Sequence, residues 1–226
     1  MKISLRQMAA VAATATLVLA GTTACNRGTD ATAGTPKVTL ALSTLNNPFF
    51  VELRDGAEAA AKTAGIQLDV VDAQNDSATQ ANQLATAATG STKAVIINPV
   101  DSDAAGSAVA TLTKAGIPVI AVDRTVNGAD LASYVASDNV AGGKQAAVEL
   151  AKAMGEEGSV IVLQGVSGTS ASRDRGAGFA EGIKDFPKIK VVAQQTANFD
   201  RARGPGRGVE PAAVQPRSDR HLRRKR

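Results

Sequence analysis

Residues 38–71 read VTLALSTLNNPFFVELRDGAEAAAKTAGIQLDVV and contain two short apolar runs separated by a stretch with helical spacing. The apolar runs cover residues 38–42 and 67–71, and Ala, Leu and Val recur at helical intervals over 49–64. Asn47 followed by Pro48 is typical of a helix N-cap with proline in the first turn, and Gly65 is placed to end the helix. This order predicts a β-α-β unit with parallel strands.

The same alternation of apolar runs and helical stretches continues to residue 200. Further apolar runs lie at 94–97, 117–122, 159–163 and 189–193, and further helical stretches at 77–88 and 139–154. Parallel strands joined by helices form open sheets covered on both faces, so the sequence predicts an α/β fold. A short extra strand near residues 133–137 leads into a second α/β run. We therefore expect two lobes, residues 37–137 and 138–200, joined near residues 136–138.

Composition narrows the classes of function. The chain has 226 residues, 44% of them hydrophobic, which is enough for one large domain or two small ones. It has one cysteine and one histidine, and His221 lies among the last six residues. No intramolecular disulfide can form, and a His-centred triad or a His-rich metal site is hard to build. These features argue against most hydrolases and metalloenzymes, and we expect no metal site.

The net charge of +4 does not indicate a nucleic-acid partner, because the positive charge lies at the two ends. Residues 37–200 carry 13 basic and 18 acidic side chains, whereas residues 201–226 carry 9 and 2. The predicted globular part is thus mildly acidic. We expect no nucleic-acid partner for it.

The N-terminus is predicted to be an export signal over residues 1–25. Lys2 and Arg6 precede an uncharged run, residues 8–20, which is too short for a membrane span and suits a signal-peptide core. We expect the mature protein to lie outside the cytoplasm, in the cell envelope.

Cys25 closes this segment, and its position after an apolar run resembles a bacterial lipoprotein start. In that interpretation Cys25 is lipidated, anchors the protein to the outer face of the membrane, and residues 26–36 form a linker. Thr22 departs from the Leu usual three positions before such a cysteine. The alternative is an ordinary signal cleaved after Ala20 or Ala24.

Polar and aromatic side chains follow several of the predicted strands. Ligands bind at the carboxyl ends of strands in an open parallel sheet, so these residues are candidate ligand groups. The candidates are Asn47, Phe49 and Phe50 after the first strand, Asp123 and Arg124 after the fourth, Arg175 in the loop after residue 163, and Phe199 after the last strand.

The chemistry of this set suits a small neutral polyol. A carboxylate accepts hydrogen bonds from hydroxyls, guanidinium groups donate them, and phenyl rings cover the C–H faces of a sugar. The alternative is a surface ion pair between Asp123 and Arg124, with Phe49 and Phe50 packed inside the first helix.

Five motifs together resemble the periplasmic ribose-binding protein family, the type I periplasmic sugar-binding proteins of ABC transporters. They lie in order between about Val38 and Arg201: STLNNPFF at 43–50, INPVDSD at 97–103, VDR at 122–124, ASDNVAGGK at 136–144 and QGVSGTSASRDRGAGF at 164–179.

The resemblance implies two lobes that close on a pyranose sugar, with no catalysis and no cofactor, and a loaded form that docks on an ABC-type permease. It also implies roles for single residues. Asn47, Asp123, Arg124 and Arg175 would hydrogen-bond the sugar, and Phe49, Phe50 and Phe199 would sandwich its ring. Ser43 and Asn98 are additional candidates.

The resemblance stops at Arg201, so we expect the first lobe to lack its final returning segment and the second lobe to be incomplete. Residues 201–226 hold 8 Arg, 1 Lys, 3 Gly and 3 Pro without apolar periodicity, which predicts a disordered basic tail. The favoured interpretation is a frameshift in a G+C-rich gene. The alternative is a basic arm for nucleic acid or anionic lipid. We expect such a chain to aggregate readily and to bind ribose weakly or not at all.

The sequence thus predicts an extracytoplasmic binding protein for a monosaccharide, first of all D-ribose, that serves an ABC importer by lobe closure. Another monosaccharide remains an alternative, because hydroxyl stereochemistry cannot be read from one sequence. A sugar-responsive transcription regulator is a second alternative. It is disfavoured because residues 1–36 contain a signal where a helix-turn-helix would lie.

Overall fold

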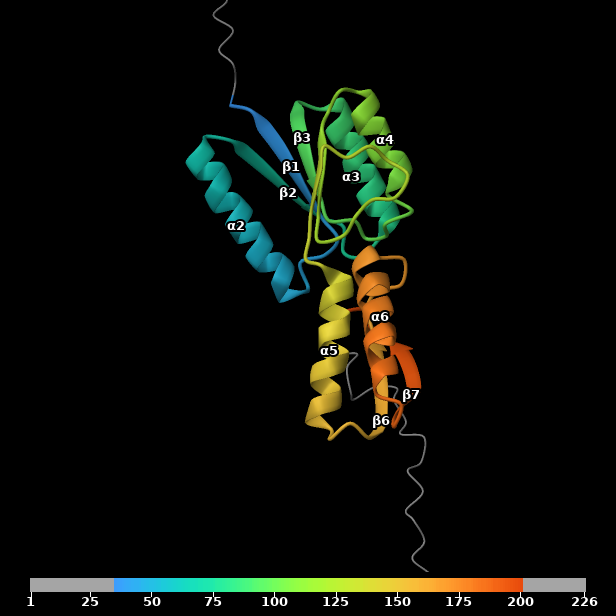
Figure 1. Cartoon of the computed structure of the whole chain (residues 1–226). Helices are drawn as coiled ribbons and strands as arrows, with labels where there is room; N and C mark the ends of the chain where they lie inside the picture. Colours follow the sequence, from blue (N-terminus) through green and yellow to red (C-terminus); the bar gives the residue numbers. More distant parts are fainter. Residues whose placement is uncertain (1–34, 201–226) are drawn as a thin grey trace, which may run out of the picture. The chain divides into compact units, whose positions relative to one another are not determined.

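The computed structural model describes residues 35–200, in which strands and helices alternate along the chain (Figure 1). In chain order the elements are β1 (Lys37–Leu42), α2 (Pro48–Ala64), β2 (Gln67–Asp72), α3 (Ser77–Thr89), β3 (Thr92–Ile97), α4 (Gly106–Lys114), β4 (Val119–Val122), β5 (Ser133–Val135), α5 (Asn139–Ala153), β6 (Gly158–Gln164), α6 (Ser170–Gly182), the short 3₁₀ helix η1 (Ile183–Asp185) and β7 (Ile189–Thr196).

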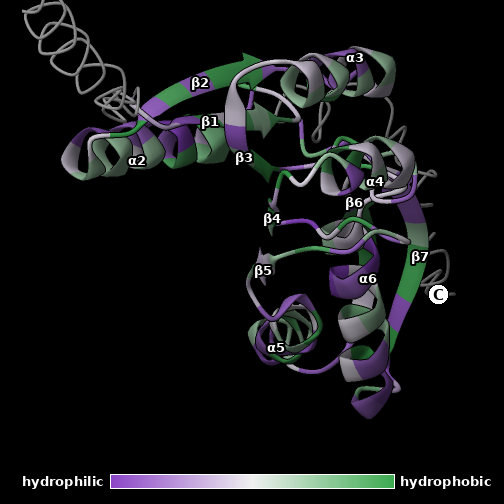
Figure 2. Ribbon diagram, turned by 90° about the horizontal axis from the view of Figure 1, so that it is seen from above, coloured by the Kyte–Doolittle hydropathy of each residue, from purple (hydrophilic) through white to green (hydrophobic). Residues whose placement is uncertain are grey.

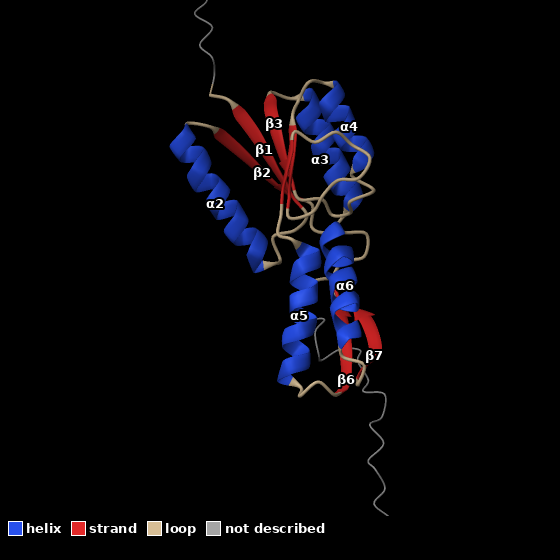
Figure 3. Ribbon diagram, viewed as in Figure 1, coloured by secondary structure: helices blue, strands red, loops and turns tan. Residues whose placement is uncertain are grey.

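Residues 37–137, which we call the first lobe, are built on a five-stranded sheet of order β2-β1-β3-β4-β5. Every neighbouring pair of strands is parallel. Helix α2 lies on one side of this sheet, and α3 and α4 lie together on the other (Figure 3). Because all the strands run the same way, their carboxyl ends share one edge of the sheet, and the loops that leave those ends meet there.

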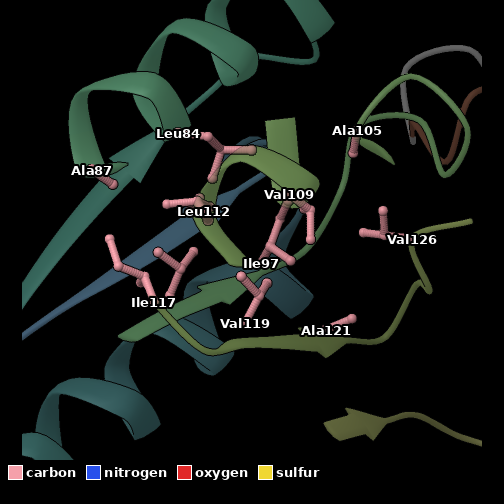
Figure 4. Packing of buried hydrophobic residues seen from close by; sticks show 12 residues of the cluster. Leu84, Ala87, Ile97, Ala105, Val109, Leu112, Ile117, Val119, Ala121 and Val126 are labelled. Atoms are coloured by element: carbon pink, nitrogen blue, oxygen red, sulfur yellow. The ribbon is translucent and has the colours of Figure 1, made fainter. Parts of the chain in front are cut away.

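The main core lies between this sheet and helices α3 and α4 (Figure 4). It is formed by twelve buried residues: Ala41, Leu84, Ala87, Val95, Ile97, Ala105, Val109, Leu112, Ile117, Val119, Ala121 and Val126. Full burial of one such aliphatic side chain larger than alanine stabilises a fold by about 1.5–3 kcal/mol. The core therefore makes a stable base for the loops at the sheet edge.

The second lobe, residues 138–200, holds a parallel two-stranded sheet of β6 and β7 among the described residues. Helices α5 and α6 pack against each other at glycines. A Cβ atom added to Gly178 would meet the Val140 carbonyl, and one added to Gly143 would meet the Arg175 carbonyl. The two backbones therefore approach closely, which only glycine permits at these positions.

The core of the second lobe is small. Its buried cluster consists of Ala151, Val160 and Ile189. Large apolar side chains of both strands stay exposed: Ile161, Leu163, Val191 and Val192. Figure 2 shows the hydrophobic colour over the middle of β7. The described part of this sheet thus presents apolar surface to solvent.

The predicted α/β class with parallel sheets is confirmed, and the predicted strands are present. Two details differ. The extra strand β5 pairs with β4 and is a fifth strand of the first sheet. The stretch predicted as a loop around Arg175 is instead helix α6, because Thr169 caps it by accepting a hydrogen bond from the Ser172 N–H.

Other predictions fall on parts of the chain that the structure does not describe. The signal over 1–25 with the lipidation site Cys25, nearly all of the linker over 26–36 and the tail over 201–226 lie outside the described residues. No helix within residues 35–200 combines the length and apolar character that crossing a bilayer requires.

Candidate functional site

All seven predicted ligand residues line one cavity of about 200 Å³. Its walls are Asn47, Phe49, Phe50, Asp123, Arg124, Ala171, Arg175 and Phe199, and only Ala171 was not predicted. The residues come from two segments of the first lobe, 47–50 and 123–124, and two of the second, 171–175 and Phe199. The structure therefore brings the candidates together, and their role toward a ligand stays a prediction.

The loop after β1 positions the first group. Asn47 is the N-cap of α2, and its Oδ1 atom accepts a hydrogen bond from the Phe49 N–H at 3.0 Å. Pro48 follows in the first turn, where its missing N–H costs nothing. Phe50 is buried, whereas Phe49 is 53% exposed. The alternative in which both rings are packed in the protein interior therefore does not hold for Phe49. Their rings meet edge to face with centroids 5.2 Å apart.

Asp123 and Arg124 follow β4, at the same edge of the sheet. Asp123 has a left-handed backbone with φ of +63°, which costs a non-glycine residue on the order of 1 kcal/mol or more. Its Oδ2 atom lies 3.6 Å from Arg124 Nε. Arg124 is only 2% exposed, so the alternative of a surface ion pair is wrong.

Arg124 is anchored by contacts with the first lobe. Its Nη1 donates to the Pro99 carbonyl oxygen at 2.9 Å, and its guanidinium carbon lies 5.3 Å from the centroid of the Phe50 ring. Within residues 35–200 its buried Nε has no hydrogen-bond acceptor, the Asp123 carboxylate lying 3.6 Å away. Burial lowers the pKa of Arg124, while the Asp123 carboxylate opposes this shift. A buried donor without an acceptor costs about 1–3 kcal/mol, which a ligand oxygen would recover.

The second lobe contributes Arg175 and Phe199. Arg175 Nε donates to Asn139 Oδ1 at 2.8 Å, which ties α6 to the start of α5. The Phe199 ring lies 5.6 Å from the guanidinium carbon of Arg124 and 5.8 Å from that of Arg175. Cation–π contacts of this kind orient the rings and the guanidinium planes.

Phe199 is held in an unusual conformation. Its φ is +54°, which is rare for a bulky residue and marks a constrained position. A Cβ atom at Gly165 would run into the Phe199 ring. Gly165, at the end of β6, therefore leaves room for this ring at the cavity.

Ser43 and Asn98, the additional candidates, lie behind the cavity and support it. Both are fully buried, and Ser43 Oγ donates to Asn98 Oδ1 at 2.6 Å. Asn98 Nδ2 in turn donates to Asp123 Oδ2 at 3.2 Å and to the Val122 carbonyl at 3.1 Å. Their hydrogen bonds hold the Asp123 carboxylate in place.

A larger cavity of about 890 Å³ adjoins the first and shares Asn47, Phe50, Arg124 and Phe199 with it. Small-molecule sites commonly measure about 300–1,000 Å³. Three of its polar residues, Asn75, Gln164 and Asn198, were not among the candidates. Asn75 follows β2, so the strand-end rule could have found it.

The combined site offers hydrogen-bond donors, a carboxylate acceptor and aromatic faces. Such a set can bind a small hydroxylated molecule and hold it between rings. Within residues 35–200, no group of three His, Cys, Asp or Glu side chains is placed to hold a metal ion.

Comparison with known proteins identifies the family to which this fold and site belong. Residues 38–205 match the model of the periplasmic binding protein domain. The chain therefore belongs to the type I periplasmic sugar-binding proteins. The matched relatives are solute-binding proteins and not enzymes.

Several relatives and solved structures are similar over the same part. The ribose import binding protein RbsB of Salmonella typhimurium is 47% identical over 167 residues, covering 74% of this chain and 56% of the relative. The xylitol-binding protein of Mycolicibacterium smegmatis is 35% identical over 182 residues, covering 80% and 52%. The Caulobacter myo-inositol binding protein, solved with myo-inositol, has a TM-score of 0.70 at 37% identity, covering 74% and 57%. The chain thus spans a little over half the length of the relatives it matches.

Proposed function

We propose that this protein captures a monosaccharide outside the cytoplasm, with D-ribose as the leading candidate, and presents it to the permease of an ABC importer. The observation that carries the proposal is Arg124. Its buried Nε has no hydrogen-bond acceptor in the described part of the chain, and its guanidinium lies within 6 Å of two phenyl rings at the cavity wall. A sugar hydroxyl is an acceptor of the right kind, and the rings suit the C–H faces of its ring.

Closure of the two lobes around the sugar is supported by the fact that both lobes contribute site residues. Asn47, Asp123 and Arg124 come from the first lobe, and Arg175 and Phe199 from the second. A ligand that contacts both groups stabilises the closed arrangement over an open one by its differential contacts.

Ribose is the leading candidate ligand because a relative named as a ribose import binding protein is 47% identical to this chain over the aligned residues. Other sugars and polyols compete, because relatives are named for xylitol and D-apiose and related structures hold myo-inositol and D-allose. Stereochemistry at each hydroxyl decides among these ligands.

The test is a ligand-observed NMR titration of the full chain with ribose, arabinose, allose, xylitol and myo-inositol, which also detects binding in the millimolar range. We expect weak binding, in the millimolar range, with ribose saturating at the lowest concentration of the five compounds. Arg124→Met should weaken this binding by at least about tenfold, since a charge-assisted bond contributes about 1.5–3 kcal/mol. Arg54→Met, at a half-buried position on α2 outside both cavities, is the matched control and should bind as the parent does. Saturation by none of the five compounds, or equal binding by Arg124→Met, would overturn the proposal.

We also propose that the mature protein begins at a lipidated Cys25 and is exported. The support is the charged and apolar pattern of residues 1–25 together with membership of a periplasmic family. Intact mass of protein extracted from membranes tests this. A mass that includes Cys25 and acyl chains is expected, and a mature form that lacks both would overturn it.

A further inference from the structure

A group of buried hydroxyls joins the two lobes beside the site. Ser102, in the turn before α4, is 0% exposed, and Ser170, the first residue of α6, is 1% exposed. Ser170 N–H donates to Ser102 Oγ at 3.0 Å, and Thr125 N–H donates to Ser170 Oγ at 2.9 Å. Ser102 N–H donates to the Gly168 carbonyl at 3.0 Å. Three hydrogen bonds thus connect residues 102–125 with residues 168–170.

The position of these bonds along the chain connects them to the ligand residues. Thr125 directly follows Arg124, and Ser170 begins the helix that carries Arg175 five residues later. The Ser170 hydroxyl therefore ties the backbone after Asp123 and Arg124 to the N-terminus of α6. Neither serine lines the two cavities described above.

The lobes are also close together at Gly168. Its φ is +84°, and a Cβ atom at this position would run into the Asp101 carboxylate. A side chain at residue 168 would have to displace the Asp101 carboxylate, and the neighbouring Ser102 makes two of the three hydrogen bonds. The contact is thus packed as well as hydrogen-bonded.

We propose that Ser102 and Ser170 are positioning residues, whose hydroxyls hold the two lobes in the arrangement in which Arg124 and Arg175 converge on one cavity. This inference deepens the proposed function and rests on it for the ligand, whereas the three hydrogen bonds between the lobes are observed independently of it. Removing either hydroxyl leaves a buried N–H without its acceptor, so the closed arrangement becomes less favourable. Affinity falls in proportion to the population of the arrangement that can bind.

The test measures the distance between the lobes in the full chain without sugar. Spin labels are placed on cysteines at Lys62→Cys on α2 and Lys152→Cys on α5, both exposed, in a Cys25→Ser background. The parent distance distribution should include a short-distance component from the arrangement in which the three hydrogen bonds form. Ser102→Ala, Ser170→Ala and Gly168→Ala should each broaden it or shift it to longer distances, while Ser107→Ala, an exposed serine on α4, should leave it unchanged.

Circular dichroism identifies any variant that has lost its secondary structure. Three variants are compared so that one that does not fold can be left out. Unchanged distances in the folded variants would overturn the inference. In the sugar titration we expect Ser102→Ala and Ser170→Ala to bind about five- to thirtyfold more weakly than the parent. If the parent binds no sugar, the proposed function fails, while the label distances still decide this inference.

Discussion

The two lobes share one construction, a parallel sheet with helices, but differ in how much apolar surface they bury. The first lobe packs twelve buried residues into one cluster between its sheet and α3 and α4. The described part of the second lobe has a cluster of three. Ile97 on β3 is 0% exposed, whereas Ile161 on β6 is 43% exposed.

This difference shows that the two halves of the site are held by different forces. Asp123 and Arg124 stand on a well-packed sheet. Arg175 and Phe199 stand on a lobe held by the glycine contacts between α5 and α6 and by the hydrogen bonds that join Ser170 to Ser102 and Thr125 of the first lobe. The second half is therefore the more easily displaced.

Removing side-chain volume at matched isoleucines should show the largest contrast. Ile97→Ala leaves a cavity in the main core and should lower the free energy of unfolding by about 2–5 kcal/mol. Ile161→Ala removes a largely solvated side chain and should lower it by less than about 1 kcal/mol. Urea denaturation followed by circular dichroism measures both. Equal losses would mean that Ile161 is buried in solution, and the contrast between the lobes would be wrong.

A substitution at the helix contact should have an intermediate effect, confined to the second lobe. Gly178→Ala places a methyl group against the Val140 carbonyl and should cost about 1–3 kcal/mol. Gly176 lies on the same helix with nothing within 4 Å of an added Cβ, so Gly176→Ala should be neutral or stabilise by up to about 1 kcal/mol. Hydrogen exchange of α5 and α6 amides resolves the effect by lobe. Identical behaviour of the two alanine variants would contradict the close approach of the helices.

The smallest effect is expected at the ion pair between Lys144 on α5 and Glu181 on α6, whose atoms Nζ and Oε1 lie 3.0 Å apart. The hydrogen bond and charge of Lys144 lower the pKa of Glu181, and those of Glu181 raise the pKa of Lys144. A lowered carboxyl pKa stabilises the fold above the unfolded value, about 4.3, and the contribution disappears as pH falls through the folded value. A raised lysine pKa stabilises it below about 10.4 and is lost as pH rises further.

Glu181→Gln should therefore lower the urea midpoint slightly at pH 7 and not at pH 3, and high salt should reduce the difference at pH 7. Glu157→Gln, exposed before β6, is the control. A difference between parent and Glu181→Gln that persists unchanged at pH 3 would show that the pair does not act through its charges.

The sequence was sufficient for the strands, because apolar runs follow a local rule. Apolar runs marked the strands, and the carboxyl-end rule together with the family motifs selected the residues that the structure gathers at one cavity. Helix α6 was missed because its glycines weaken the helical pattern, and their function is contact with α5, which no single segment reveals. The left-handed backbone of Asp123 and Phe199 is likewise set by tertiary contacts.

The number of strands in each sheet could not be read from the sequence. Strand β5 has no buried residue, and its place beside β4 comes from backbone pairing. The buried state of Arg124 was also not visible, because its charge predicts exposure and only the rings and the Pro99 carbonyl around it explain the burial.

The most direct test of a sugar site shared by both lobes is a crystal structure of the full chain grown with ribose. We predict a sugar ring between Phe50 and Phe199, with Arg124 Nε donating to one of its hydroxyls and Arg175 within hydrogen-bond distance of another. Ribose bound against one lobe alone, with Arg124 and Arg175 more than a sugar's width apart, would contradict it.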